Sequence, residues 1–307
     1  MNWPNQKKFA FTIVDDTDKA TIENVKPIYD LLAELGIKTT KTVWPLAPSQ
    51  KENFGGMTCQ DEEYLKWLYG LRDKGFEIAF HGATDHTSSR EDTERAIDFF
   101  HRFFGDEDFL YCAHSGQKES MYWGKYRLGG TRRITYQFVT LHIRNNHYKG
   151  HVEGDPLFWG DLCRKHIRYV RNFVFKEINT FKICPEMPYH DPSRPYVNYW
   201  FASSDGADVC SFRKLMSEKN QESLEKEGGL CIVYTHFAKG FYTNRKLDPE
   251  FVRLMRSLSR RNGWFAPAST ILDYLRSRPG WVRNINPSRI RELEWKWLLM
   301  KCLHGRS

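Results

Sequence analysis

Three acidic residues follow the first apolar segment of the sequence. Residues 8–14 are apolar and partly β-branched, as in a buried strand, and Asp15, Asp16 and Asp18 come directly after them. Functional sites of parallel α/β proteins lie at the carboxyl edge of the sheet, and adjacent aspartates disfavour a strand end unless a ligand stabilises them. We therefore expect a cation here. Helix capping by Asp16 or Thr17, with Asp18 near the helix dipole, is the alternative, but it does not explain adjacent carboxylates.

Histidines follow two further apolar segments. His81 and His86 lie in the sequence HGATDH, directly after residues 76–80, and His236 follows residues 230–235. Imidazole and carboxylate groups bind zinc and similar divalent ions, and an open fourth position leaves room for a water molecule. Three strand ends that carry Asp, His and His would converge on one face of an α/β barrel.

The elements that must position these residues alternate between strands and helices. This alternation predicts a mainly parallel sheet, open or closed into a barrel, in a single domain over residues 1–280. Residues 115–210 are less regular, with strand or helix pieces near 135–143 and 160–178. The sequence predicts strands at 8–14, 37–44, 76–80, 109–113, 230–235 and 264–265, and helices at 21–35, 61–74, 89–104, 248–262 and 268–277.

The last segment, residues 281–307, is predicted to contain a separate amphipathic helix. From residue 287 onward, Ile290, Leu293, Trp297 and Met300 share one side of it. We expect this side to pack on the domain or on a second subunit. Contact with a membrane surface is the alternative, because the segment is basic and contains tryptophan.

Composition and charge restrict the partners. The net charge is +8, and 40% of the residues are hydrophobic. A basic protein favours anionic partners, and the absence of nucleic-acid-binding signatures argues against DNA or RNA. The sequence has no signal-peptide-like or membrane-spanning stretch, and its seven cysteines form no CxxC pair. We therefore expect a cytoplasmic protein, either free or peripheral to the inner face of the membrane, with reduced cysteines.

Four segments resemble the motifs of the NodB-type polysaccharide deacetylases, a carbohydrate esterase family. They are FTIVDDTD (11–18), GFEIAFHGATDH (75–86), LCIVYTHFA (230–238) and GWFAPASTILDYL (263–275), in the order of the family. The resemblance covers about residues 8–278. It implies a distorted (β/α) barrel of about seven strands, one divalent metal ion, and hydrolysis of an N- or O-acyl group on a sugar.

The resemblance also implies residue roles. Asp15 matches the general base, Asp16 and His81 match metal ligands, and His236 matches the acid that protonates the leaving group. The second metal histidine of the family lies four residues after the first, where this chain has Asp85. We assign the ligand to His86, one position later. The alternatives are ligation by Asp85 and a metal held by only two protein ligands. Zinc is the expected metal, with cobalt, nickel and manganese as alternatives.

The arginine-containing third motif of the family has no clean match after residues 109–113. His114, Glu119 and Trp123 are expected to line the pocket there instead, with Tyr122 or Trp123 as a platform for a sugar. A core-facing Tyr–Trp pair is the alternative for these aromatic residues.

A long loop at residues 187–206, rich in proline and aromatic residues, is expected to contribute to specificity. His190 and Arg194 in this loop are assigned to substrate binding, with Arg194 facing an anionic group. A rigid surface loop without a ligand is the alternative.

The predicted function is removal of an acetyl or formyl group from an amino sugar or sugar intermediate in glycan or lipopolysaccharide biosynthesis. The basic charge favours a nucleotide- or lipid-linked substrate. A protein that keeps the fold but has lost catalysis, and serves in glycan binding or assembly, is the alternative. An amidase for a non-sugar substrate is a third, weaker reading.

Overall fold

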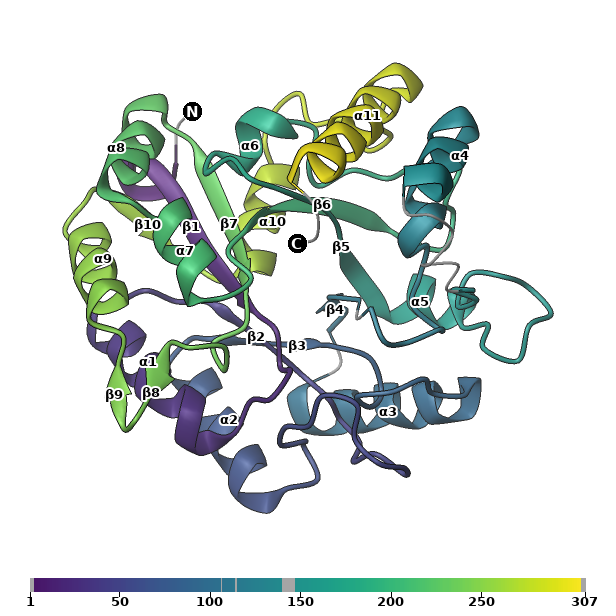
Figure 1. Ribbon diagram of the computed structural model, residues 1–307, viewed down its shortest axis with the longest axis horizontal. Helices are drawn as coiled ribbons and strands as arrows, with labels where there is room; N and C mark the ends of the chain where they lie inside the picture. The colour runs from purple at the N-terminus through teal and green to yellow at the C-terminus, as the bar shows by residue number, and fades with distance from the viewer. Residues whose placement is uncertain (1–2, 106, 114, 140–146, 305–307) are drawn as a thin grey trace.

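A closed barrel of parallel strands forms the centre of the molecule (Figure 1). The computed structural model describes residues 3–105, 107–113, 115–139 and 147–304. Its seven barrel strands follow one another in chain order, and β1 also pairs with β7 to close the barrel. The predicted barrel is therefore confirmed. The strands are β1 (Phe9–Asp15), β2 (Thr40–Val43), β3 (Glu77–Phe80), β4 (Phe109–Tyr111), β5 (Ile167–Phe175), β6 (Tyr199–Asp205) and β7 (Leu230–Thr235).

An eighth strand, β10 (Gly263–Phe265), joins the barrel at one end only. It pairs with the amino-terminal part of β1. At the carboxyl end of β1, Val14 and Asp15 pair instead with Thr40 and Lys41 of β2. On one side, β1 thus has two successive neighbours, and β7 lies along its other side. This arrangement fixes the end of β1, where the three aspartates begin.

Helices surround the barrel (Figure 1). Five of them lie within three residues of their predicted limits at each end: α1 (Ile22–Glu34), α2 (Glu62–Asp73), α3 (Arg90–Phe104), α9 (Pro249–Ser259) and α10 (Ala268–Arg276). Their apolar sides pack on the strands, and α3 illustrates the spacing with buried Thr93, Ala96, Ile97 and Phe100. The shorter elements α7 (Val209–Leu215), α8 (Glu218–Glu227), η1 (Pro4–Gln6) and the hairpin β8 (Tyr242–Thr243) with β9 (Lys246–Leu247) were not predicted.

The less regular region supplies two barrel strands. Strand β5 and helix α5 (Gly160–His166) occupy the predicted piece near 160–178. Helix α4 (Gly130–Val139) covers the described part of the piece near 135–143, and residues 140–143 lie outside the described residues. The region also contains two short helices, η2 (Gly124–Arg127) and α6 (Thr180–Ile183).

The last helix, α11 (Pro287–His304), packs against α4 and β5 (Figure 1). Ile290, Leu293 and Trp297 are buried there, and Met300 packs against the same core. Three residues on the other side are exposed, at 41% for Trp295, 57% for Leu299 and 76% for Leu303. Within the described parts of the chain, every helix is too short or too polar to span a bilayer.

Candidate metal centre

Four side chains that can bind a metal lie together at the carboxyl end of the barrel. Asp16 follows β1, His81 follows β3 and His236 follows β7, while Asp18 lies two residues beyond Asp16. All four are buried. The structure thus brings together residues from three strand ends and adds Asp18, which belongs to the predicted acidic cluster but was not assigned as a metal ligand.

Each of the two imidazoles faces one oxygen of both carboxylates. His81 Nε2 lies 3.1 Å from Asp16 Oδ1 and 3.9 Å from Asp18 Oδ1. His236 Nε2 lies 3.5 Å from Asp16 Oδ2 and 3.7 Å from Asp18 Oδ2. Ligand atoms of Asp16, Asp18 and His236 are all within 4.8 Å of one another. Two carboxylates between two imidazoles form a donor set that suits zinc and related divalent ions.

Two hydrogen bonds fix the orientation of Asp16. The backbone N–H of Asp18 donates to Asp16 Oδ1 at 3.0 Å, and the hydroxyl of Tyr234 donates to Asp16 Oδ2. Burial, together with the charge of Asp16, raises the pKa of Tyr234 well above its usual value, so the tyrosine is a neutral donor. Contacts of this kind hold a carboxylate in the geometry that metal binding needs.

The ring of His236 is held through its other nitrogen. Nδ1 lies 2.7 Å from the backbone carbonyl oxygen of Ala207. Because a carbonyl oxygen only accepts hydrogen bonds, Nδ1 carries the proton and Nε2 faces the two carboxylates. The ammonium of Lys239, which is 36% exposed, lies 3.9 Å from Asp18 Oδ2 and marks the side of the centre nearest to solvent.

Asp15, which precedes Asp16, has different surroundings. Its Oδ2 lies 3.1 Å from Lys41 Nζ on β2 and accepts a hydrogen bond from the Tyr29 hydroxyl of α1 at 3.1 Å. Its Oδ1 accepts from the backbone N–H of Phe237 at 2.8 Å. Burial raises the pKa of this carboxyl, and the charge of Lys41 and the hydrogen bonds oppose that rise. Asp15 therefore belongs to a buried ion pair between the barrel and α1.

The capping alternative for the acidic cluster is wrong. Thr21 is the N-cap of α1, and its side chain accepts from the backbone N–H of Asn24. Neither Asp16 nor Thr17 takes that position, because four or five residues separate them from the first turn. The acidic residues are consequently not explained by the needs of the helix.

The candidates for the remaining ligand lie in the loop after His81. Asp85 Oδ2 accepts backbone N–H groups of Asn53, Phe54 and Gly55 at 2.8–3.3 Å, which ties two loops together. His86 Nε2 lies 3.9 Å from Asp85 Oδ1. Its Nδ1 lies 3.2 Å from the hydroxyl of Thr84. Ligation by His86 stays a prediction.

Three of the five predicted substrate-binding residues follow β4. Trp123 is partly exposed and stacks on the guanidinium of Arg127, whose Cζ lies 3.5 Å from the ring centroid. Glu119 is buried, and its backbone carbonyl accepts an indole N–H from Trp159 at 2.7 Å. His114 lies outside the described residues.

The other two predicted substrate-binding residues are held by their own loop and its neighbours. Nδ1 of His190 lies 3.0 Å from the carbonyl oxygen of Val197. Arg194 donates to Glu294 of α11 at 3.0 Å and to the backbone carbonyl of Arg127 at 2.7 Å, so it fastens the loop to this helix. Their roles in substrate binding stay predictions.

Lys41, Tyr234 and Arg171 were not predicted as site residues. Lys41 and Arg171 are charged residues inside barrel strands, and each is buried. A charge within a strand that has both faces covered needs a partner or a ligand, and this is the signal that could have identified them.

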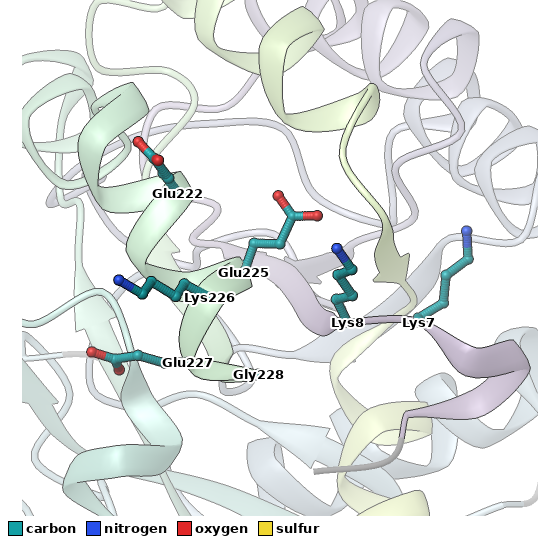
Figure 2. A pocket seen from close by; sticks show the side chains of 7 residues that line it. All are labelled: Lys7, Lys8, Glu222, Glu225, Lys226, Glu227 and Gly228. Atoms are coloured by element: carbon teal, nitrogen blue, oxygen red, sulfur yellow. The ribbon is translucent and has the colours of Figure 1, made fainter.

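A surface depression lies at the opposite end of the barrel, where the strands begin (Figure 2). Its side chains of both charges come from α8 and from the segment before β1, and no imidazole is among them. Mixed charges of this kind are typical of a solvated surface. The lining residues are Lys7, Lys8, Glu222, Glu225, Lys226, Glu227 and Gly228.

Comparison of the sequence with models of protein families gives no match, and no curated protein matches it. Solved structures do resemble it. The Puue allantoinase is 13% identical, with a TM-score of 0.53 over 92% of this chain and 94% of that one. A Mycobacterium smegmatis protein provisionally named a polysaccharide deacetylase is 11% identical, with a TM-score of 0.49 over 93% and 96% of the two chains.

A third structure comes from Bordetella bronchiseptica and is provisionally named a polysaccharide deacetylase involved in O-antigen biosynthesis. It is 11% identical, with a TM-score of 0.38 over 89% of this chain and 93% of that one. Identities this low establish the fold alone. The fold that the motifs predicted is confirmed at that level: the chain has a closed seven-stranded (β/α) barrel, and it shares its fold with the Puue allantoinase.

Proposed function

We propose that this chain is a metal-dependent hydrolase that removes an acetyl or formyl group from the nitrogen of an amino sugar or sugar intermediate. The convergence of Asp16, Asp18, His81 and His236 at the carboxyl end of the barrel carries this proposal. A barrel of this type places its active site at that end. The order of the four sequence motifs supports a sugar as the substrate.

Asp16, Asp18 and His81 are assigned to hold one divalent metal ion, with zinc as the first candidate. When bound, such an ion polarises the acyl carbonyl and lowers the pKa of a bound water, to about 7 in zinc enzymes. Tyr234 orients Asp16 through its hydroxyl. His86 is the predicted further ligand, and the metal content of His86→Ala tests that role.

His236 is assigned to proton transfer. Its Nε2 faces the two carboxylates, and Nδ1 is held by the carbonyl of Ala207. In the proposed reaction Nε2 accepts a proton as a water oxygen bonds to the acyl carbon. The imidazolium then gives that proton to the sugar nitrogen as the C–N bond breaks, so the products are the free amine and the carboxylic acid.

Asp15 is proposed as a positioning residue, although the family motif matches it to the general base. Both its oxygens already have donors, and its side chain is buried beside α1. The N–H that it accepts belongs to Phe237, the neighbour of His236. Asp15 therefore connects the ends of β1 and β7 and keeps Asp16 and His236 at their observed separation.

The substrate is proposed to be an intermediate of glycan or lipopolysaccharide biosynthesis. The charge of +8 favours nucleotide- or lipid-linked sugars as substrates. Contact with a membrane surface would use the exposed side of α11, formed by Trp295, Leu299 and Leu303. Serine at these three positions should reduce sedimentation with anionic vesicles and leave turnover of a soluble substrate unchanged.

Metal analysis combined with an acyl-release assay tests the proposal. We expect about one zinc or related ion per chain by mass spectrometry, and acetate or formate release from a panel of N-acyl amino sugars, free and nucleotide-linked. His81→Ala should lose both metal and activity. Asp30→Asn, which alters a half-exposed carboxylate paired with Lys26, is the matched control.

Absence of a bound divalent ion at micromolar metal would overturn the enzyme proposal and favour the alternative, a glycan-binding protein with this fold. The ratio of formate to acetate released separates the two acyl groups. Acyl release from non-sugar amides alone would instead identify an amidase.

A further inference from the structure

Two buried arginines, Arg127 and Arg171, lie beside the metal centre. Their exposed fractions are 7% and 2%. Within the described parts of the chain, no carboxylate comes within ion-pairing distance of either guanidinium. Arg194 is equally buried, but it pairs with Asp191 and Glu294. Among the described residues, one buried arginine in this region thus has a counter-charge and two have none.

Aromatic rings surround these two guanidinium groups. Both guanidinium groups lie over the Trp123 ring, whose centroid is 3.5 Å from Arg127 Cζ and 5.7 Å from Arg171 Cζ. Arg171 Cζ also lies 3.6 Å from the ring centroid of Tyr234. Stacking stabilises the cations, but it does not satisfy their N–H groups. Arg127 Nη2 and Arg171 Nε are buried and have no hydrogen-bond partner among the residues that the structure describes.

Tyr234 connects this arginine pair to the metal centre. One face of its ring contacts Arg171, and its hydroxyl donates to Asp16. Trp123, which both guanidinium groups contact, is partly exposed, so the arginine pair lies at the edge of the core. A group bound by the two arginines would therefore belong to a molecule that also reaches Asp16.

We infer that Arg127 and Arg171 bind a phosphate group of the substrate. Two guanidinium groups carry two positive charges, which match a phosphate dianion better than a single carboxylate. Their N–H groups also form the forked hydrogen bonds that phosphate oxygens accept. The inference rests on the proposed function, because it assigns the phosphate to the molecule that is deacylated.

The titration of Arg127 agrees with this geometry. Burial, and then the charge of Arg171, lowers the pKa of Arg127 to about 9. The charged form of Arg127 is therefore less favourable here than in water. A bound dianion would stabilise both cations, and the protein would gain stability when phosphate binds.

Titration of the purified, metal-containing protein with inorganic phosphate tests the inference, with calorimetry and thermal unfolding as readouts. We expect phosphate to bind and to raise Tm. Arg127→Met and Arg171→Met should each weaken binding at least tenfold. Arg276→Met is the matched control, because Arg276 also stacks on a tyrosine but has a carboxylate partner in Asp273. This variant should bind phosphate as the wild type does.

Phosphate could also bind at the metal, and Asp16→Asn separates the two sites. Binding that survives in Asp16→Asn and disappears in Arg171→Met supports the inference. Binding that disappears only in Asp16→Asn overturns it. Acetate is the second probe, and affinity equal to that of phosphate would overturn the assignment to a dianion.

Stability without phosphate gives an independent readout. Removing one of two unneutralised like charges should leave Tm unchanged or raised in phosphate-free buffer. A lower Tm in both methionine variants, with unchanged phosphate affinity, would mean that the arginines are structural and would overturn the inference. A protein that holds metal but binds no phosphate refutes this inference alone, whereas one that binds phosphate but no metal refutes the proposed function.

Discussion

The adjacent residues Asp15 and Asp16, the last residue of β1 and the one after it, belong to two different regions of the molecule. Asp15 lies between barrel and helix, with a lysine ammonium at 3.1 Å and two hydrogen-bond donors. Asp16 lies at the end of the barrel, where it faces the imidazoles of His81 and His236. One carboxylate is neutralised by the fold, and the other belongs to a group that suits a cation.

This difference follows from strand geometry. Successive side chains along an extended backbone point to opposite faces of the sheet, so adjacent residues in the sequence have different surroundings. Asp15 is directly opposite Lys41 in the register of β1 and β2. In the proposed function, the first aspartate positions its neighbours and the second binds the metal. Substitutions at and around the two aspartates test this difference in role, and the loss of metal, activity or stability that we expect decreases from Asp16 to Lys239.

Loss of the Asp16 carboxylate should have the largest effect. Asp16→Asn removes a ligand that two imidazoles face, and we expect loss of the bound metal and of measurable turnover. Metal analysis and acyl-release rates check both. An Asp16→Asn protein that keeps stoichiometric metal and full activity would place the centre elsewhere.

Replacement of His236 should separate catalysis from metal binding. We expect His236→Ala to lower kcat by about 10²- to 10⁴-fold, the usual contribution of an acid–base group. Metal content should stay close to that of the wild type, because Asp16, Asp18 and His81 remain. If His236→Ala lost the metal instead, the imidazole would be a ligand and another group would transfer the proton.

Replacement of Asp15 should act on stability first. Asp15→Asn leaves the buried Lys41 without its partner, and breaking a buried pair from one side costs about 3–5 kcal/mol. Urea unfolding measures this loss. The double variant Asp15→Asn/Lys41→Met should recover part of the lost free energy of unfolding. The double-mutant cycle gives the coupling energy between Asp15 and Lys41.

The opposite result for Asp15 would be equally informative. An Asp15→Asn protein with wild-type free energy of unfolding, full metal content and no turnover would restore Asp15 as the general base, as its family motif suggests. In that case both aspartates would act in catalysis, Asp15 as the general base and Asp16 as a metal ligand.

The hydroxyl of Tyr234 should have a smaller effect on metal affinity. Tyr234→Phe removes the donor to Asp16 Oδ2 and keeps the ring under Arg171. Loss of such an outer contact lowers metal affinity by about 10- to 100-fold. Competition with a chelator measures it. Unchanged affinity would mean that the backbone N–H of Asp18 suffices to orient Asp16.

Lys239 should have the smallest effect, in contrast to Lys41. Its ammonium is 3.9 Å from Asp18 and 36% exposed. Exposed pairs contribute about 0–1 kcal/mol, so Lys239→Met should unfold with nearly the same free energy as the wild type. A loss as large as that of Asp15→Asn would show that Lys239 neutralises the centre when no metal is bound.

The sequence predicted the barrel and the strand ends because both depend on local patterns. Helical spacing in α1 and α3, and short apolar segments that end in Asp or His, are visible without knowledge of the contacts. The strand β6 was missed because it is buried along almost its whole length and follows a proline-rich loop, so no alternation marked it.

The partners of the polar residues could not be predicted. Lys41 meets Asp15, and Tyr234 meets Asp16, only because the barrel sets the register between their strands. Likewise, Arg194 was expected to face an anionic ligand, and the fold gives it Glu294 from a helix about a hundred residues away. Sequence identifies which residues can do chemistry, and register decides which of them meet.

The pairing of β1 with β7 has a consequence for folding kinetics. Asp15 and Phe237 are 222 positions apart in the chain, and their hydrogen bond forms only when the barrel closes. Contacts of such long sequence separation form late, because the loop must close before any of them is gained. The metal centre should therefore be assembled in the last step of folding. During synthesis, a nascent chain would remain inactive until its β7 segment has left the ribosome.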